Sequence, residues 1–150
     1  MSFRLAHLAA GDPLISEAGR LFDAYRQFYE QASDVDAATA FLAARLARQE
    51  STIVLALHGD EAVGFMQLYP TWCSVAMAPI WVLYDLYTTP AARGQGVARR
   101  LLDEAQRLGK ASGAAYLQLS TAHTNLTAQR VYEDHGWTMD SVFRTYTLAL

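Results

Sequence analysis

The stretch that decides the fold of this chain reads Arg93-Gly94-Gln95-Gly96-Val97-Ala98. It follows an apolar, aromatic run at residues 80–88, which predicts a buried strand, and it opens a run through residue 111 with apolar side chains at helical spacing. A helix N-terminus leaves about four backbone N–H groups without intrahelical partners, and glycines let a ligand approach these groups closely. The stretch therefore predicts a binding site for a pyrophosphate, with Arg93 and Arg99 adding positive charge nearby.

The same turn has two other interpretations. It could be a strand-to-helix turn that uses glycine for its geometry alone. Gly94-Gln95-Gly96 also begins the G-x-G-x-x-G pattern of dinucleotide sites, but Arg99 stands where the third glycine would be. Roughly 80 residues precede the turn, whereas that pattern usually opens its domain, so a nicotinamide or flavin site is disfavoured.

Secondary-structure signals on both sides of the turn change between strand and helix patterns. Strands are predicted at residues 3–8, 51–57, 62–69, 80–88 and 115–120, with two final strands around Ser141 between residues 137 and 150. Helices are predicted at residues 13–31, from residues 33–36 through about residue 49, at residues 96–111 and at residues 125–135. Pro70 and Pro79 are expected to bracket a looser connection. These elements predict a single α+β domain, residues 1–150, with helices on both faces of one sheet.

Composition and charge disfavour several classes of function. Apolar residues make up 52% of the chain and charged residues 18%, as in a globular domain. The net charge of −3 argues against nucleic-acid binding, which needs a basic surface. No run approaches the ~20 apolar residues of a membrane span, and the first residues lack a signal-peptide run, so we expect a cytoplasmic protein with no membrane partner. Cys73 is the single cysteine and has no base beside it in the sequence, so we expect an ordinary, non-catalytic thiol. The four histidines lack metal-ligand spacing, so we expect no metal site.

Two segments of the chain resemble the motifs of one enzyme family. Arg93, Gly96 and Ala98 fill the three fixed places of the signature Gln/Arg-x-x-Gly-x-Gly/Ala of the GNAT family of N-acetyltransferases, and residues 83–88 are similar to that family's fourth strand. Residues 125–133, followed by Gly136-Trp137, resemble its second motif. The resemblance is specific over residues 80–140 and looser, through element order, over residues 1–79.

The resemblance implies a fold and a coenzyme site. The fold is a mixed, mostly antiparallel, V-shaped sheet flanked by about four helices, and acetyl-coenzyme A lies where the sheet splays between its fourth and fifth strands. By this resemblance the backbone N–H groups of residues 93–98 hold the pyrophosphate, with Arg99 as a further coenzyme contact. Leu86 and Thr88 pair with the pantetheine arm like an added strand. The Tyr87 N–H is the candidate donor to the reaction's oxyanion. Asn125 and Ala128, or Gln129 in place of Ala128, are implied as further coenzyme contacts.

The implied chemistry needs an acid and a base. A lysine-like amine, with a pKa near 10.4, is roughly 0.1% neutral around pH 7, and only the neutral amine attacks a thioester. The family resemblance makes Tyr132 the general acid for the departing sulfur, although Tyr132 alone could be a core residue and Asn125 a helix cap. Asp85 is the candidate base, because a carboxylate on an apolar strand needs a purpose or a partner; a structural hydrogen-bond role is the alternative.

The sequence around Asp85 bears on its direction and on the acceptor. Strict alternation along the strand would place Trp81, Leu83, Asp85 and Tyr87 on one face. Leu83-Tyr84-Asp85 resembles the Leu-Glu-Asp of diamine acetyltransferases within the family, but Tyr84 replaces the first acid, which argues against polyamine specificity.

The acceptor pocket is predicted to use residues of the first helix and the strand ends. Aromatic rings can hold a cation, although aromatic residues at helical spacing are often simply core. The candidates are Tyr25, Tyr29, Glu30, Tyr69 and Trp72.

Three functions remain open from the sequence. The first is an N-acetyltransferase that acetylates a small-molecule amine by direct attack in a ternary complex, similar to the branch of yeast histone and polyamine acetyltransferases. The second is a lysine or N-terminal acetyltransferase acting on proteins or peptides, and the third is a non-catalytic acyl-coenzyme A sensor. Related members are often dimers, which makes the final hairpin a candidate homodimer interface.

Overall fold

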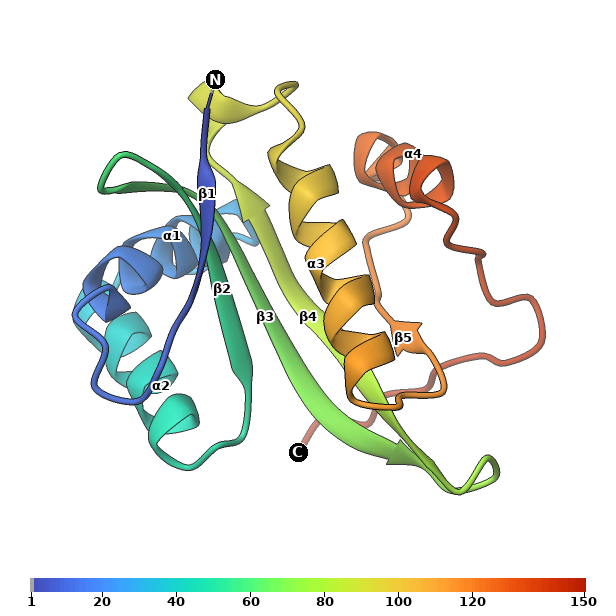
Figure 1. Cartoon of the computed structure of the whole chain (residues 1–150). Helices are drawn as coiled ribbons and strands as arrows, with labels where there is room; N and C mark the ends of the chain where they lie inside the picture. Colours follow the sequence, from blue (N-terminus) through green and yellow to red (C-terminus); the bar gives the residue numbers. More distant parts are fainter. Residues whose placement is uncertain (1) are drawn as a thin grey trace. The chain divides into compact units, whose positions relative to one another are not determined.

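A computed structural model describes residues 2–150, which form two compact units, the first ending at Ser120 and the second spanning Thr121–Leu150 (Figure 1). The second unit contains the helix α4 (Leu126–His135). The first unit contains, in order, β1 (Arg4–His7), α1 (Ile15–Phe28), α2 (Val35–Ala47), β2 (Thr52–His58), β3 (Glu61–Cys73), β4 (Ala78–Thr88), a short 3₁₀ turn η1 (Pro90–Ala92), α3 (Val97–Ala111) and β5 (Leu117–Gln118).

One sheet organises the first unit. Its strands lie in the order β1-β2-β3-β4-β5, with antiparallel neighbours from β1 to β4 and a parallel pairing between β4 and β5 (Figure 1). The β4–β5 pairing is confined to Trp81 with Leu117 and Val82 with Gln118. Among the described residues, β4 therefore has no strand neighbour on that side from Leu83 to its end. This confirms the expected mixed sheet that opens between its fourth and fifth strands.

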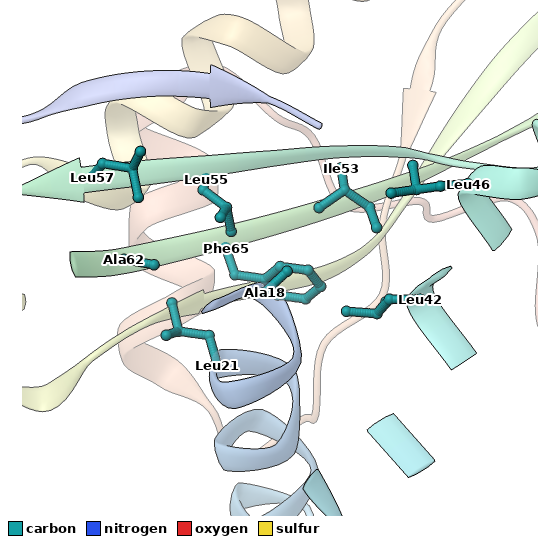
Figure 2. Packing of buried hydrophobic residues seen from close by; sticks show 9 residues of the cluster. All are labelled: Ala18, Leu21, Leu42, Leu46, Ile53, Leu55, Leu57, Ala62 and Phe65. Carbon is teal, nitrogen blue, oxygen red and sulfur yellow. The ribbon is translucent and has the colours of Figure 1, made fainter. Parts of the chain in front are cut away.

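The helices α1 and α2 cover one face of the sheet. Apolar side chains of both helices meet side chains of β2 and β3 in one core cluster (Figure 2). Burial of this apolar surface is the main force that holds the helices on the sheet. The cluster consists of Ala18, Leu21, Leu42, Leu46, Ile53, Leu55, Leu57, Ala62 and Phe65.

The helix α3 packs on the sheet at a point where β3 carries no side chain. A Cβ atom added at Gly64 would lie 2.5 Å from Cγ1 of Val97 and 3.2 Å from Cδ1 of Leu101. Val97 is the first residue of α3 and is buried. The absence of a side chain at Gly64 thus lets the first turn of α3 approach the sheet closely, which fixes where the preceding glycine turn stands.

A buried carboxylate, Asp23, ties the end of α1 to the connection that leads into α2. Its Oδ1 accepts from the Asp34 N–H at 2.7 Å, and its Oδ2 accepts from Ser33 Oγ at 2.7 Å and Gln27 Nε2 at 3.0 Å. Burial acts to raise the pKa of Asp23, but these hydrogen bonds to the charged form outweigh it and hold the pKa below its ordinary value. The sequence alone gave no sign of this anchor.

The loose connection predicted between Pro70 and Pro79 is wrong. β3 continues through Pro70 to Cys73, β4 begins at Ala78, and residues 74–77 form the hairpin loop. The pairing of β2 with β3 ends at Leu68, so within residues 2–150 β3 beyond that point has a strand neighbour on one side only. Proline lacks an N–H and is tolerated where a strand has such an open side.

The two strands predicted between residues 137 and 150 are also wrong. Residues 138–150 contain no strand, so the expected final hairpin is absent from the described chain. An alternating sequence becomes a strand only where a partner takes its backbone hydrogen bonds, and an isolated hairpin is marginal in water. Large apolar side chains of this segment are exposed, namely Met139, Val142, Phe143, Tyr146, Leu148 and Leu150.

The other predicted elements are present within a few residues of their expected bounds. The prediction of a single domain over residues 1–150 stays a prediction. No helix in residues 2–150 combines the length and the apolar character that a membrane crossing requires.

Candidate active site

The glycine turn before α3 is shaped by two left-handed residues. Gly94 has φ +74° and Gly96, the N-cap of α3, has φ +83°. A Cβ atom at either position would meet nothing within 4 Å, so the glycines are required by backbone conformation, and the space beside them is open. The turn therefore needs glycine for its backbone geometry, and this need is compatible with an anion site at the same place, which stays a prediction.

The turn is tethered to the end of β4 by side chains that leave the start of α3 uncapped. Arg93 Nε donates to the Thr88 carbonyl oxygen at 3.1 Å, and its guanidinium lies 5.8 Å from the Tyr87 ring centroid. Gln95 Nε2 donates to the Ala91 carbonyl oxygen at 3.0 Å. Gly96 supplies no side-chain cap, and the first turn of α3 has no acidic residue. An uncapped, positively polarised helix start of this kind fits a diphosphate group.

The strand that leads into the turn has one open edge. Leu86, Tyr87 and Thr88 pair on one side with Met66, Phe65 and Gly64 of β3. On the other side the described β5 does not reach them. A strand edge with unpaired backbone groups can take an extended ligand as an added strand, which is the geometry the pantetheine arm requires.

A β-bulge in β4 changes the predicted directions of its side chains. Asp85 pairs with Gln67, but Leu83 pairs with the next residue, Leu68, so Tyr84 is the extra residue on β4. Phe65 of β3 packs in the core cluster under α1 and α2, so Gln67, two residues further along, and its partner Asp85 lie on that same face. Leu68 and its partner Leu83 point to the opposite face, which α3 covers. Trp81 also faces α3, because its indole Nε1 donates to Ser112 Oγ at 2.8 Å. The prediction of one shared face for residues 81, 83, 85 and 87 is therefore wrong.

Asp85 is buried with a neutral hydrogen-bond partner. It is 6% exposed, and its Oδ2 accepts from Gln67 Nε2 at 2.9 Å. Burial raises the pKa of Asp85 to about 6, against the opposing effect of the Gln67 hydrogen bond. A carboxyl group with a pKa close to neutrality is suited to accept a proton during a reaction at physiological pH. The expected structural hydrogen bond is thus present, and the role of Asp85 as a base stays a prediction.

Several predicted acceptor residues gather around the bulge. The Tyr25 hydroxyl donates to the Tyr84 carbonyl oxygen at 3.4 Å, and the Tyr25 ring lies 5.0 Å from Tyr29 and 6.2 Å from Tyr87 between centroids. Tyr69 contacts Tyr84 edge to face at 5.5 Å. Burial, followed by the nearby Asp85 charge, raises the pKa of Tyr69 to about 12. The structure therefore brings these rings together beside Asp85.

Two predicted acceptor residues lie apart from this cluster. Trp72 pairs with Pro79, six residues before Asp85 on β4, which corresponds to roughly 20 Å along a strand. Its side chain is 71% exposed near the hairpin loop. Glu30 follows α1 in a left-handed conformation, with φ +64°, and is also exposed.

The second unit presents the other predicted coenzyme residues. The Asn125 side chain accepts from the Ala128 N–H at 3.2 Å and caps α4, so its capping role is confirmed, whereas its contact with the coenzyme stays a prediction. The Tyr132 ring lies 6.3 Å from the Trp137 ring within the same unit. Gln129 Nε2 donates to the carbonyl oxygens of Ala122 and His123, which holds the loop before the helix.

Sequence reasoning missed the polar residues behind Asp85. Gln67 is fully buried, and its Oε1 accepts from Ser51 Oγ at 2.8 Å. A glutamine inside an otherwise apolar predicted strand is a usable signal, because a buried amide needs hydrogen-bond partners.

Among residues 2–150, no group of three or more His, Cys, Asp or Glu side chains is arranged to hold a metal ion.

Comparison with known proteins identifies the family. The model of the acetyltransferase (GNAT) family matches residues 18–137. The chain belongs to the GNAT family. An N-acetyltransferase of Bacillus subtilis strain 168, YhfO, is 46% identical to this GNAT chain over 128 residues, which cover 85% of the chain and 86% of that protein. A crystal structure of a probable acetyltransferase is 36% identical, with a TM-score of 0.91 over 98% of this chain and 97% of the other.

A more distant structure shows the same fold. An aminoglycoside N-acetyltransferase, solved in complex with coenzyme A, is 18% identical and superposes with a TM-score of 0.82 over 99% of this chain and 96% of its own. Family membership makes this GNAT protein an acyl-coenzyme A-dependent N-acetyltransferase and confirms the resemblance seen in the sequence. The similarity to a yeast-like branch stays a prediction.

Proposed function

We propose that this GNAT protein transfers the acetyl group of acetyl-coenzyme A to the amine of a small molecule by direct attack within a ternary complex. The observation that carries the proposal is the continuity of one strand, β4. A buried carboxylate, Asp85, is followed by an open strand edge, and that edge leads into an uncapped helix start. These are, in order, the features that proton removal, a pantetheine arm and a diphosphate would each require.

The coenzyme is proposed to lie along this path. The backbone N–H groups from Arg93 to Ala98, with Arg99 nearby, bind the diphosphate. The pantetheine arm pairs with Leu86 and Thr88 and runs back along β4, which brings the thioester near the bulge. Asn125 and Ala128 are proposed as further coenzyme contacts by similarity to the family. The family model matches residues 18–137, which supports the proposal that both units belong to one domain over residues 1–150.

The proposed reaction removes two protons from the acceptor nitrogen and delivers one proton to the departing sulfur. Asp85 takes a proton from the ammonium group of the acceptor, and the resulting amine attacks the carbonyl carbon of the thioester. The predicted donor to the oxyanion, the Tyr87 N–H, is wrong: the Thr89 N–H donates to the Val63 carbonyl oxygen of β3 at 3.0 Å, and by alternation along the strand the Tyr87 N–H faces β3 as well. A backbone N–H on the open edge of β4 is proposed instead to stabilise the negative charge on the carbonyl oxygen. The C–S bond then breaks as Tyr132 protonates the departing thiolate. The acceptor nitrogen gives up its second proton, which restores the Tyr132 hydroxyl group, and the neutral amide remains.

The acceptor is proposed to carry its positive charge into the tyrosine cluster beside Asp85. Tyr25, Tyr29, Tyr69 and Tyr87 offer ring faces and hydroxyl groups around a single carboxylate. Aromatic rings attract cations, and a carboxylate supplies the counter-charge. A cytoplasmic location and a homodimer remain predictions from the sequence.

The test is acetyl transfer by the pure protein with a panel of amines. Diamines, amino acids, lysine peptides and peptide N-termini are supplied with acetyl-coenzyme A, and acetylated products are measured by mass spectrometry. Product detection is preferable to thiol detection because Cys73 is a free thiol that would react with a thiol reagent. The proposal expects turnover with a small amine. Turnover with peptides alone would favour a protein acetyltransferase, and coenzyme binding without any product would favour a sensor.

A further inference from the structure

A chain of polar side chains runs from the residue before β2 across β3 and ends on Asp85 in β4. Ser51, the residue before β2, donates from Oγ to Oε1 of Gln67 at 2.8 Å. Gln67, in β3, donates from Nε2 to Oδ2 of Asp85 in β4 at 2.9 Å. Gln67 is fully buried and Asp85 is 6% exposed, so the hydrogen bond between them lies in a poorly solvated interior, whereas the bond from the half-buried Ser51 is partly buried. Such bonds are strong when made and costly when broken.

The register of the sheet makes this contact specific. Gln67 and Asp85 are directly paired residues on the same face, and the bulge residue Tyr84 separates them from the next pair, Leu68 with Leu83. Directly opposite side chains in an antiparallel pair lie about 5 Å apart at Cβ, within reach of an amide-to-carboxylate hydrogen bond. The bulge and the Gln67 amide together determine the direction of the Asp85 carboxyl group.

The partner of Asp85 is neutral, which matters for a base. A lysine or arginine at position 67 would favour the carboxylate strongly and make it a poor proton acceptor. A glutamine amide binds one carboxylate oxygen and leaves the charge unpaired. The Ser51 hydroxyl occupies Oε1 of the amide, which leaves Nε2 directed at Asp85.

We propose that Gln67 is a positioning residue for acetyl transfer: it holds Oδ2 of Asp85 so that Oδ1 receives the proton of the acceptor amine, and Ser51 sets the orientation of the Gln67 amide. The inference rests on the proposed function, in which Asp85 is the base. Gln67 itself contacts neither acceptor nor coenzyme and acts through Asp85.

Other titratable groups near Asp85 are mainly tyrosines. Tyr69 on β3 interacts with the Asp85 charge, and Tyr25 of α1 and Tyr87 of β4 line the same face. Arg45 of α2 and Glu50, in the connection before β2, reach Tyr69 electrostatically with opposite signs. The basic residue of this group, Arg45, forms an ion pair with Glu50, with 2.7 Å between Nε and Oε2, rather than with Asp85.

The test compares pH profiles of kcat in Gln67→Leu, Ser51→Ala and the matched control Ser51→Thr. Gln67→Leu removes the hydrogen bond that favours the carboxylate, so the acidic midpoint of the profile should rise by about one pH unit. A rise from about 6 to about 7 lowers the deprotonated fraction of Asp85 at pH 7 only about twofold, and loss of the orientation of the carboxyl group should bring the total fall in kcat to at least about tenfold. The KM for acetyl-coenzyme A should stay within about twofold, because Gln67 lies behind the carboxylate. Ser51→Ala should shift the midpoint in the same direction by less, and Ser51→Thr should not shift it. If Gln67→Leu does not fold, the serine pair carries the comparison.

A second readout does not depend on activity. Carbon-13 NMR titration of the Asp85 carboxyl group should show its pKa higher in Gln67→Leu than in the wild type. Equal pKa values together with unchanged kcat would overturn the inference. If Asp85→Asn retains full kcat, the assignment of the base fails instead. A wild type that acetylates no amine would refute the proposed function and, with it, the inference.

Discussion

Replacing Asp85 with Asn should make the folded protein more stable at neutral pH. The fold raises the pKa of this carboxyl group from its usual 3.8 to about 6, so the folded state binds the proton more tightly than the unfolded chain does. A shift of about two pKa units corresponds to about 3 kcal/mol of unfolding free energy, at 1.36 kcal/mol for each unit. The penalty is absent below about pH 4, grows between pH 4 and 6, and is complete above pH 6. Asn does not titrate, and its Oδ1 can still accept from Gln67.

Urea unfolding of the wild type and Asp85→Asn between pH 4 and pH 8 measures this difference. The two proteins should differ least at pH 4, and the variant should gain about 3 kcal/mol at pH 8, which corresponds to a rise in Tm of roughly 6–12 °C. The same variant should lose acetyl transfer, because the base is gone. An unfolding free energy at pH 8 equal to or below that of the wild type, or a difference independent of pH, would refute the reasoning.

The second buried aspartate provides a control of opposite sign. The pKa of Asp23 is lowered, so its charged form stabilises the fold above its ordinary pKa and this contribution is lost as the pH falls. Asp23→Asn places an amide among three donors and should cost about 2 kcal/mol at pH 7. The cost should shrink in acid. A stabilising effect of Asp23→Asn would contradict the distinction between the two sites.

Two further substitutions test the coenzyme site and the acid. Gly64→Ala places a Cβ atom 2.5 Å from Cγ1 of Val97; it should cost about 1–3 kcal/mol in urea unfolding and raise the Kd for acetyl-coenzyme A several-fold in calorimetry, because the start of α3 must move. An unchanged Kd would show that the close contact between Gly64 and α3 does not affect coenzyme binding at the glycine turn. Tyr132→Phe should lower kcat by about 10²-fold or more with nearly unchanged coenzyme affinity, and an unchanged kcat would remove Tyr132 from the role of general acid.

Local signals were sufficient to predict the glycine turn and the helix after it. The left-handed conformations of Gly94 and Gly96 are ones that glycine adopts without cost, so the residue type reveals the backbone. The same holds for α4, where Asn125 caps the N-terminus and Gly136 ends the helix with φ +105°. These features depend on residues a few positions apart, which a sequence displays directly.

Features that depend on strand pairing were not predictable in this way. The bulge at Tyr84 has no local pattern, because it arises from the register between β3 and β4. The hydrogen bond from Gln67 to Asp85 joins residues 18 positions apart and needs the same register. A proline after a strand-like run predicts the end of a strand at Pro70, and only the absence of β2 beside it in the described residues explains why the strand continues.

Titration calorimetry with acetyl-coenzyme A and with S-acetylpantetheine, which lacks the diphosphate and the adenosine nucleotide attached to it, tests the central claim most directly. Uncapped N–H groups at the start of α3 are proposed to bind the diphosphate. This proposal predicts one-to-one binding of acetyl-coenzyme A and at least about tenfold weaker binding of the shortened thioester. Equal affinity for the two compounds, or no heat with acetyl-coenzyme A, would contradict it.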